Sequence, residues 1–291
     1  MPESWRYRGQ DVDRQRVAWI REFIAAHPAS SRWKLSRQLC EALGWKQANG
    51  ALRDGVCRGL LLMLEREGVI ELPPVRRLIR GQRRSSRSRP EAVLIDATPL
   101  ETRLRELGPV ELGQVRRTAD EALFNSLIEN HHYLGYEQPV GEHLKYLAWA
   151  QGRPVACIAW SSAPRHLGPR DRFIGWSQPA RKRNIHLLAY NTRFLILPWV
   201  RVPHLASHIL GRMAAVVPAD WERMYAHPIC LLETFVDPSR FRGTCYRAAN
   251  WIVVGATTGR GNNDPTHRPN RPVKDVLVLP LTRQFRRLLG E

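Results

Sequence analysis

The sequence has no apolar run long enough to cross a membrane. A membrane-spanning helix needs roughly 18 consecutive apolar residues, and the apolar runs here are short and interrupted by Pro, Trp or Arg. The opening residues, MPESWRYRGQDVDRQR, are polar and charged, which is not the pattern of a secretory signal. We therefore expect a cytoplasmic protein with no membrane partner.

Cysteine is also scarce, and its positions show no paired motif. The five cysteines are scattered and form no CxxC pair. An odd, scattered set is typical of reduced thiols in a cytosolic protein, so a disulfide framework is not expected.

Acidic residues are too few to balance the basic ones. The 291 residues include 45 Lys and Arg but 27 Asp and Glu, a formal net charge of +18. Such an excess favours a polyanionic partner, and arginine suits bidentate contacts with phosphate and guanine. We expect nucleic acid, most simply DNA; the bland alternative is a high-GC genome that favours arginine codons. A hydrophobic content of 43% predicts a globular protein with a real core.

Residues 1–74 are predicted to form a winged-helix-like DNA-binding domain. Apolar residues recur at helical spacing in 12–27, 32–44 and 52–68, and 69–74 has the composition of a short strand. The alternative is a small helical docking module that does not touch DNA. In the DNA-binding interpretation, the start of the third helix reads base edges. The residues expected there are Trp45, Lys46, Gln47, Asn49 and Arg53.

Residues 75–110 are predicted to be a basic arm followed by a connector. The segment VRRLIRGQRRSSRSRP, residues 75–90, has seven arginines and no acidic residue. It cannot bury itself, so it is expected to contact phosphates or to act only as a solvated spacer. Its arginines are Arg76, Arg77, Arg80, Arg83, Arg84, Arg87 and Arg89.

Residues 111–291 are predicted to form a second, mixed α/β domain, which makes the protein α+β. A helix over 121–130 precedes a β-hairpin, 143–150 and 153–160, with a tight turn at Gln151-Gly152. Residues 171–177 look like a short strand or loop. Strands, helices and strands then alternate to the end of the chain.

This order of helix, hairpin, strand, helix, strand, helix and strand resembles the GNAT acyltransferase fold. The likeness is most specific in LLETFVDPSRFRGTCYRAANWIVVGATTGRG, residues 231–261. The resemblance implies a cleft between two splayed central strands, here 194–197 and 229–233.

A longer resemblance covers residues 10–285. The phrases HHYLGY, PVGEHLKYLAW, GPRDRFIGW, NTRFLILPWV and ETFVDPSRFRGTCYRAANW are similar to the DruA family of the Druantia anti-phage system, which also occurs near mobile elements. This implies other defence or mobile-element proteins as partners. A more distant likeness is to the phage Mom proteins, GNAT-like enzymes that modify adenine in DNA. The matching residues are His132-Tyr133 and Tyr246 with Asn250-Trp251.

The cofactor turn departs from the GNAT pattern. A GNAT holds the pyrophosphate of its cofactor in an R/Q-x-x-G-x-G/A turn, whose glycines let the backbone approach the phosphate. The corresponding residues here, 201–206, have His204 at the central glycine, and Pro203 removes an amide donor. The departure argues against acetyl-CoA as the cofactor. The identity of the donor stays open, and so does the presence of a divalent metal.

The candidate catalytic residues lie in two distant segments. If the segments converge, imidazole, phenol and carboxylate groups would suit general acid–base chemistry, or one His and two carboxylates would hold a divalent metal. Four of these residues also have a plain structural interpretation: packing for His131 and Tyr246, an arginine partner for Glu233, and a turn for Asp237-Pro238. The candidates are His131, His132, Tyr133, Glu233, Asp237 and Tyr246.

Three functions remain open at this point. The first is a DNA-binding enzyme whose GNAT-like domain modifies or processes a nucleotide, with Arg181, Lys182 and Arg183 contacting the nucleic-acid backbone and tryptophans stacking an unpaired base. The second is a metal-dependent nuclease or strand-transfer enzyme that uses His132, Glu233 and Asp237. The third is an inactive adaptor that binds DNA for a partner protein.

Overall fold

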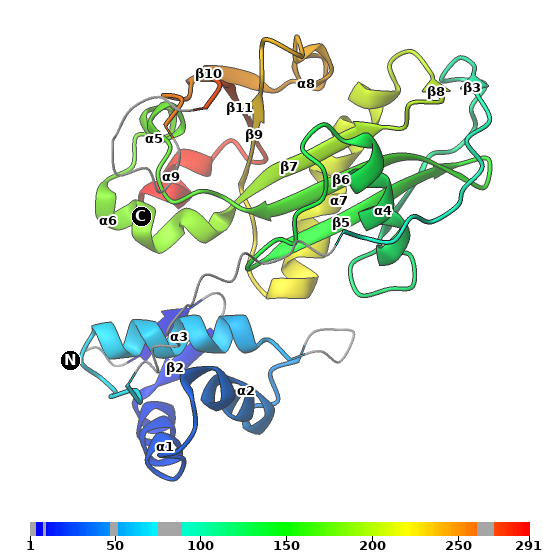
Figure 1. Ribbon diagram of the computed structural model, residues 1–291. Coiled ribbons are helices and arrows are strands. Elements are labelled where there is room, and N and C mark those ends of the chain that lie inside the picture. Colours follow the sequence, from blue (N-terminus) through cyan, green and yellow to red (C-terminus); the bar gives the residue numbers. More distant parts are fainter. Residues whose placement is uncertain (1–3, 8–9, 47–51, 75–88, 261–270) are drawn as a thin grey trace. The chain divides into compact units, whose positions relative to one another are not determined.

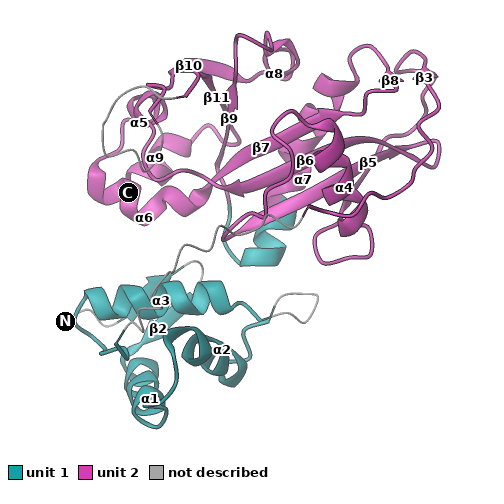
Figure 2. Cartoon of the chain, viewed as in Figure 1, with its two compact units in different colours: residues 1–87, 219–228 teal, residues 88–218, 229–291 magenta. Residues whose placement is uncertain are grey.

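The computed structural model describes residues 4–7, 10–46, 52–74, 89–260 and 271–291. The chain divides into two compact units, which Figure 2 colours separately. Unit 1 comprises Met1–Arg87 with Ala219–Pro228, and unit 2 comprises Ser88–Pro218 with Ile229–Glu291. No helix in these ranges combines the length and the apolarity needed to cross a membrane.

Unit 1 has a helical core with a small antiparallel sheet. Helices α1 (Arg14–Ala25), α2 (Arg32–Ala42) and α3 (Asp54–Arg66) follow the strands β1 (Ser4–Tyr7) and β2 (Gln10–Asp13). The side chains of Asp13 and Ser31 cap α1 and α2 by accepting hydrogen bonds from Arg16 N and Lys34 N. Apolar faces from all three helices then form one buried cluster.

The strand expected over residues 69–74 is wrong. Val69–Pro74 form no strand, and the two-stranded sheet precedes the helices instead. Val69, Ile70 and Leu72 are nevertheless buried, because they pack into the helical cluster. The apolar side chains of this segment are therefore buried against the helices although the segment is not part of a sheet.

Unit 2 is built around one mixed sheet of seven strands (Figure 1). The strand order is β10-β11-β9-β7-β6-β5-β4, and every neighbouring pair is antiparallel except β7 with β9. The strands are β4 (Glu111–Gln114), β5 (His143–Ala150), β6 (Arg153–Ser162), β7 (Leu188–Ile196), β9 (Leu231–Val236), β10 (Ile252–Ala256) and β11 (Asp275–Pro280).

The β5–β6 hairpin is confirmed at the expected turn. Gln151 and Gly152 both have positive φ, 52° and 71°, as a two-residue hairpin turn of type I′ requires. The helix before it is confirmed as α4 (Glu121–His131), whose Glu121 and Asn125 contact Lys145 of β5. Helix α4 therefore covers the face of the sheet to which Lys145 points.

The central strands β7 and β9 are parallel over a short stretch only. Their register runs from Leu188 opposite Leu231 to Asn191 opposite Thr234. Strand β7 continues to Ile196 and β9 to Val236 without further pairing to each other. The expected divergence of the two central strands is therefore present, and it begins at Asn191 and Thr234.

Helices cover both faces of this sheet. Figure 1 shows α4 in front of β5 and β6, with α7 (Leu205–Tyr225) passing behind them. The remaining elements are α5 (Gly168–Ile174), α6 (Gln178–Asn184), η1 (Ile185–Leu187), α8 (Thr244–Ala248), α9 (Phe285–Gly290) and the short parallel pair β3 (Leu100–Glu101) and β8 (Val200–Arg201).

Helix α5 corrects the expectation of a strand or loop over 171–177. Pro169 lies in its first turn, where a missing amide costs nothing, and Gly175 ends it with a φ of 80°. Outside this insertion, the expected order of helix, hairpin, strand, helix, strand, helix and strand is confirmed. The fold is therefore α+β with a GNAT-like mixed sheet.

Candidate active site

The His132–Tyr133 turn begins where α4 ends. His132 caps the helix, and its backbone N–H donates to Ile128 O at 3.1 Å. The N–H of Leu134 donates to Nδ1 of His132 at 3.2 Å. Because Nδ1 accepts this bond, the proton of the neutral ring is assigned to Nε2. His132 therefore presents a donor, not a basic nitrogen, on its outer side.

The surroundings of His132 favour this neutral form. Burial, and to a smaller extent the nearby cations of Arg193, Arg240 and Lys274, lower the pKa of His132 to about 4. Three chain segments thus bring positive charge to one imidazole. None of these three cations belongs to the catalytic set expected from the sequence.

Tyr133 contacts the turn that follows strand β9. Its ring lies 5.4 Å from the ring of Phe241, and the guanidinium of Arg240 lies 4.5 Å from the centroid of the Tyr133 ring. Burial and the charge of Asp237 raise the pKa of Tyr133, so its hydroxyl keeps its proton at neutral pH. The two distant segments therefore meet here, through Tyr133 and Phe241.

Asp237 stands at the end of β9 and shapes that turn. Its carboxylate accepts hydrogen bonds from Ser239 N at 3.1 Å and Ser239 Oγ at 2.6 Å, which lower the pKa of Asp237. Its carbonyl accepts from the amides of Arg240 and Phe241. Asp237 is thus both a turn former and an ionised carboxylate beside Tyr133.

Glu233 does not join this cluster. It is fully buried and paired with the equally buried Arg170 of α5, with Nη1 3.0 Å from Oε2. Arg170 also forms an ion pair with Asp171, with Nη2 2.8 Å from Oδ1. The second oxygen of Asp171, Oδ2, lies 3.0 Å from Nη1 of Arg181. Burial raises the pKa of Glu233 to about 7 against the opposing pull of Arg170.

Tyr246 lies on the opposite face of β9 from Glu233. Its hydroxyl donates to Oδ1 of Asn191 at 2.6 Å, and Thr234, the neighbour of Glu233, also bonds Asn191. Consecutive residues of a strand point to opposite faces, so the sheet separates Tyr246 from Glu233. Tyr246 is buried, and burial raises its pKa strongly; Tyr190 and Tyr133 are close enough to raise this pKa further.

His131 is turned away from His132. Its ring meets Trp199 edge-on, with 5.2 Å between the ring centroids. Of the six candidate residues, the structure therefore gathers His132, Tyr133 and Asp237, and it adds Arg193, Arg240, Phe241 and Lys274. The pattern DPSRF after a central strand was the available signal for Arg240 and Phe241.

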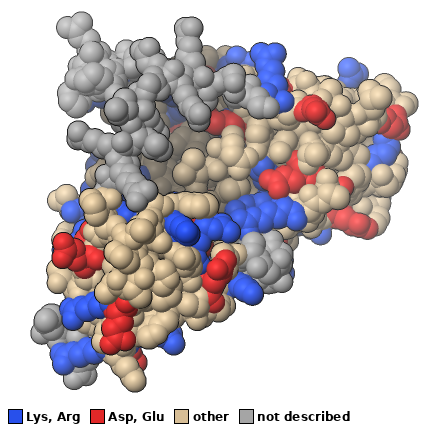
Figure 3. All heavy atoms as spheres, turned by 60° about the horizontal axis from the view of Figure 1, so that its bottom comes forward, with Lys and Arg blue, Asp and Glu red and all other residues tan. Residues whose placement is uncertain are grey.

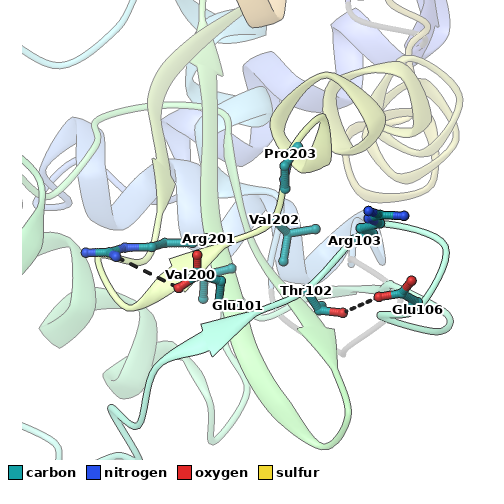
Figure 4. A pocket seen from close by; sticks show the side chains of 8 residues that line it. All are labelled: Glu101, Thr102, Arg103, Glu106, Val200, Arg201, Val202 and Pro203. Carbon is teal, nitrogen blue, oxygen red and sulfur yellow. Dashed lines mark hydrogen bonds and ion pairs between the residues drawn. The ribbon is translucent and has the colours of Figure 1, made fainter.

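The segment corresponding to the GNAT cofactor turn does not fit a pyrophosphate group. His204 keeps the left-handed backbone, with φ 65°, that a glycine would adopt, but it carries an exposed side chain and follows a proline without an N–H. The pocket beside it, of about 680 Å³, is lined by two glutamates, and one of them, Glu101, lies 3.9 Å from Arg201 (Figure 4). We therefore assign no cofactor to this turn.

The candidate catalytic residues were also considered above as ligands of a divalent metal. Within the described ranges, no group of three or more His, Cys, Asp or Glu side chains is placed to hold a metal ion. The set His132, Glu233 and Asp237, expected for a metal-dependent nuclease, is not gathered, because Arg170 engages Glu233.

The residues expected to contact DNA fall partly outside the described structure. Gln47, Asn49 and six arm arginines, Arg76, Arg77, Arg80, Arg83, Arg84 and Arg87, lie outside it. Lys46 is exposed and forms an isolated antiparallel β-bridge with Leu52. Arg53 immediately precedes α3. Trp45 is buried in the helical cluster, so it supports the unit instead of reading bases. Arg89 is exposed and lies 3.4 Å from Glu129.

The basic residues of α6 divide by environment. Arg181 belongs to the Asp171 network, and Arg183 donates to the backbone carbonyl of Glu291. Lys182 is exposed. Figure 3 shows both basic and acidic side chains on the face drawn.

Three solved structures with a similar fold are acetyltransferases, each with a low TM-score. The ribosomal-protein-S18-alanine N-acetyltransferase from Escherichia coli matches with 11% identity, 60% of this chain, 95% of that chain and a TM-score of 0.36. The aminoglycoside acetyltransferase AAC(6′)-Ib, in complex with coenzyme A and kanamycin, is 14% identical. The match covers 61% of this chain and 96% of that chain, with a TM-score of 0.39. A GNAT-family acetyltransferase from Streptococcus pneumoniae is 9% identical. The match covers 60% of this chain and 100% of that chain, with a TM-score of 0.39. These scores are too low to bear on function.

Sequence families give a firmer result. No curated protein matches the sequence. The family model described as Druantia protein DruA matches residues 63–269, which is more than half of the chain and includes the whole cluster around His132 except Lys274. The chain therefore belongs to the DruA family of the Druantia anti-phage system.

Proposed function

We propose that this protein binds DNA and that the cluster of His132, Tyr133 and Asp237 acts on a nucleotide during phage defence or in a mobile element. Residues 1–74, as a winged-helix-like module, and the basic arm within residues 75–110 hold the nucleic acid. The domain over residues 111–291 carries the chemistry, which is base modification or processing. Other Druantia proteins are the expected partners.

One observation carries this proposal: neutral donors and a carboxylate stand together among cations. His132 offers Nε2–H, Tyr133 offers its hydroxyl, and both keep their protons at neutral pH. Donors of this kind suit the carbonyl oxygens and ring nitrogens of a base or the oxygens of a phosphate. The surrounding Arg193, Arg240 and Lys274 supply the positive field that a polyanion requires.

Asp237 is the hydrogen-bond acceptor of the cluster. Its lowered pKa keeps it ionised, and a carboxylate can accept a hydrogen bond from an exocyclic amine of a base. Glu233 is not available for this role because it is enclosed with Arg170. Modification at a base amine would therefore depend on Asp237 and be insensitive to removal of the Glu233 charge.

Nucleoside mass spectrometry tests the proposal. Plasmid DNA is recovered from cells that express the full chain, alone and with other Druantia proteins, and is digested to nucleosides. We expect a nucleoside of altered mass with the natural chain, its loss with Asp237→Asn, and its retention with Glu233→Gln. A product that depends on Glu233 and not on Asp237 would contradict the assignment.

A second candidate function is favoured by the cofactor turn, which does not fit a pyrophosphate group. In this case unit 2 binds nucleic acid and leaves the chemistry to a partner. Unmodified and uncut DNA in every combination, together with intact DNA binding, would support this adaptor role and remove the enzymatic one.

A further inference from the structure

Two exposed aromatic side chains of unit 2 lie in contact at the candidate site. Tyr133 is 38% exposed and Phe241 is 48% exposed, although both are large and mostly apolar. They are the aromatic members of the exposed large hydrophobic residues in the described part of unit 2, and their ring centroids are 5.4 Å apart. Buried contact between aromatic rings is ordinary, but a shared exposed position is typical of a binding surface. We call this pair the aromatic platform.

Independent segments fix the platform in place. On one side, the ring of His132 lies 4.8 Å from that of Tyr133 at an interplanar angle of 30°. Arg193 of β7 donates from Nε to Gly135 O at 3.1 Å, which ties the Tyr133 turn to the central strand. On the other side, the backbone of Phe241 bonds the carbonyl of Asp237. The two rings are therefore presented by hydrogen-bonded turns and need little ordering before a ligand binds.

The charge beside the platform selects the kind of ligand. The guanidinium of Arg240 lies 4.5 Å from the centroid of the Tyr133 ring, and Lys274 and Arg193 also act on the neighbouring His132. An apolar protein segment would gain nothing from three cations. A flat ring attached to a phosphate would use both features, since the ring stacks on the aromatics and the phosphate meets the cations.

We propose that the aromatic platform of Tyr133 and Phe241 takes an unpaired nucleobase of a single-stranded nucleic acid. The inference rests on the proposed function, because it names the form of nucleic acid that the same site receives. A base inside a duplex is stacked on both faces by its neighbours, so it cannot also stack on Tyr133. Selectivity for unpaired nucleotides, with little preference among bases, follows from this geometry.

Binding measurements with the full chain test the inference. The probes are a fluorescently labelled 20-nucleotide single strand, its duplex and the corresponding RNA strand. We expect Tyr133→Ala and Phe241→Ala each to weaken single-strand binding about tenfold, which corresponds to the loss of one base–aromatic stack, and to change duplex binding less than twofold. The RNA strand should lose affinity alongside the DNA strand, because stacking does not involve the sugar.

Matched variants separate stacking from other effects. Tyr133→Phe keeps the ring and removes the hydroxyl, so it should retain the base quenching that Tyr133→Ala loses, whatever the lost donor costs in affinity. Leu94→Ala removes a side chain that is 98% exposed in unit 2 but lies outside the platform, and it should change nothing. A 2-aminopurine base in the single strand should be quenched by the natural chain and less by either alanine variant. Unchanged melting temperatures would exclude unfolding as the cause.

The outcomes distinguish this inference from the proposed function. Loss of single-strand binding and quenching without any modified nucleoside would keep the platform and remove the chemistry. A modified nucleoside with undiminished single-strand binding in both alanine variants would keep the chemistry and overturn the platform. Equal losses on duplex and single strand would overturn the platform too, because they would indicate general loss of affinity.

Discussion

Arg170 and Glu233 form an ion pair in which neither side chain is exposed to solvent, with 3.0 Å between Nη1 and Oε2. The pair joins α5, inserted between the hairpin and β7, to the central strand β9. A buried charge without its partner is costly. This contact therefore helps to hold α5 on the sheet.

Substitution of Arg170 by methionine should be strongly destabilising. Arg170→Met leaves the Glu233 carboxylate buried without its partner, and we expect a loss of about 3–5 kcal/mol in the free energy of unfolding. Arg172→Met is the matched control, because Arg172 lies on the same helix and is exposed. Urea unfolding followed by circular dichroism measures both. Equal urea midpoints for the two variants would refute the role given to the pair.

The pH dependence of stability should depend on His143. Nδ1 of His143 bonds Gly141 O at 2.8 Å, while Nε2 accepts from Arg116 Nε at 3.0 Å, so the ring is held neutral. Burial and Arg116 lower the pKa of His143 to about 4. A folded-state pKa below the unfolded value of about 6.5 means that stability is lost as the pH falls from 6.5 toward 4.

The size of this effect is measured against an uncharged variant. His143→Gln can keep both hydrogen bonds and does not titrate. The natural chain should lose stability relative to it by on the order of 3 kcal/mol between pH 6.5 and pH 4. Parallel pH profiles of the two proteins would show that His143 does not have the lowered pKa.

His132 should behave in solution as a neutral donor. In ¹⁵N spectra of histidine-labelled protein, its ring should show a protonated Nε2 at pH 6, because Leu134 N–H donates to Nδ1. The ring should titrate near pH 4, because burial and the three cations lower its pKa. Assignment uses His132→Gln, which removes one signal. Titration near pH 6.5 would instead make His132 an ordinary exposed imidazole, able to act as a general base.

Much of this architecture could be predicted from residues, because it depends on local patterns. The hairpin follows from Gln151-Gly152 between apolar runs, and the helix before it from the spacing of Leu123, Phe124 and Leu127. Glu233 could not be placed in the same way. Its partner Arg170 is 63 residues away, in a helix whose composition resembles a strand or loop.

The candidate site was predictable only in part for a related reason. Alternation along a strand sends Glu233 and Thr234 to opposite faces, but residue type alone does not say which face holds the site. In the structure, the turn after β9 brings Asp237, Arg240 and Phe241 close to Tyr133. Chemistry-bearing residues were recognised, but their partition between the two faces required the structure.

Tyr246 should matter for stability and not for activity. Tyr246→Phe removes the hydroxyl that donates to Asn191 Oδ1 at 2.6 Å and leaves a buried acceptor without this bond. We expect a loss of about 1–3 kcal/mol in thermal or urea unfolding. Single-strand binding and any modified nucleoside should be unchanged at a temperature where the variant is folded. A selective loss of product would return Tyr246 to the reacting group.

The arginine-rich segment 75–90 should determine how strongly salt weakens DNA binding. Replacing its seven arginines by serine keeps the segment length, so the reach between the units is unchanged. If each arginine neutralises one phosphate, the slope of log K against log salt should fall by about 6 for duplex DNA. Aromatic-platform variants should leave the slope as it is, because a base stack releases no counterions. Kd values for duplex DNA between 50 and 300 mM salt, measured by anisotropy, give both slopes. An unchanged slope in the serine variant would place the segment outside the interface, and the DNA contacts would then rest on residues within the two units.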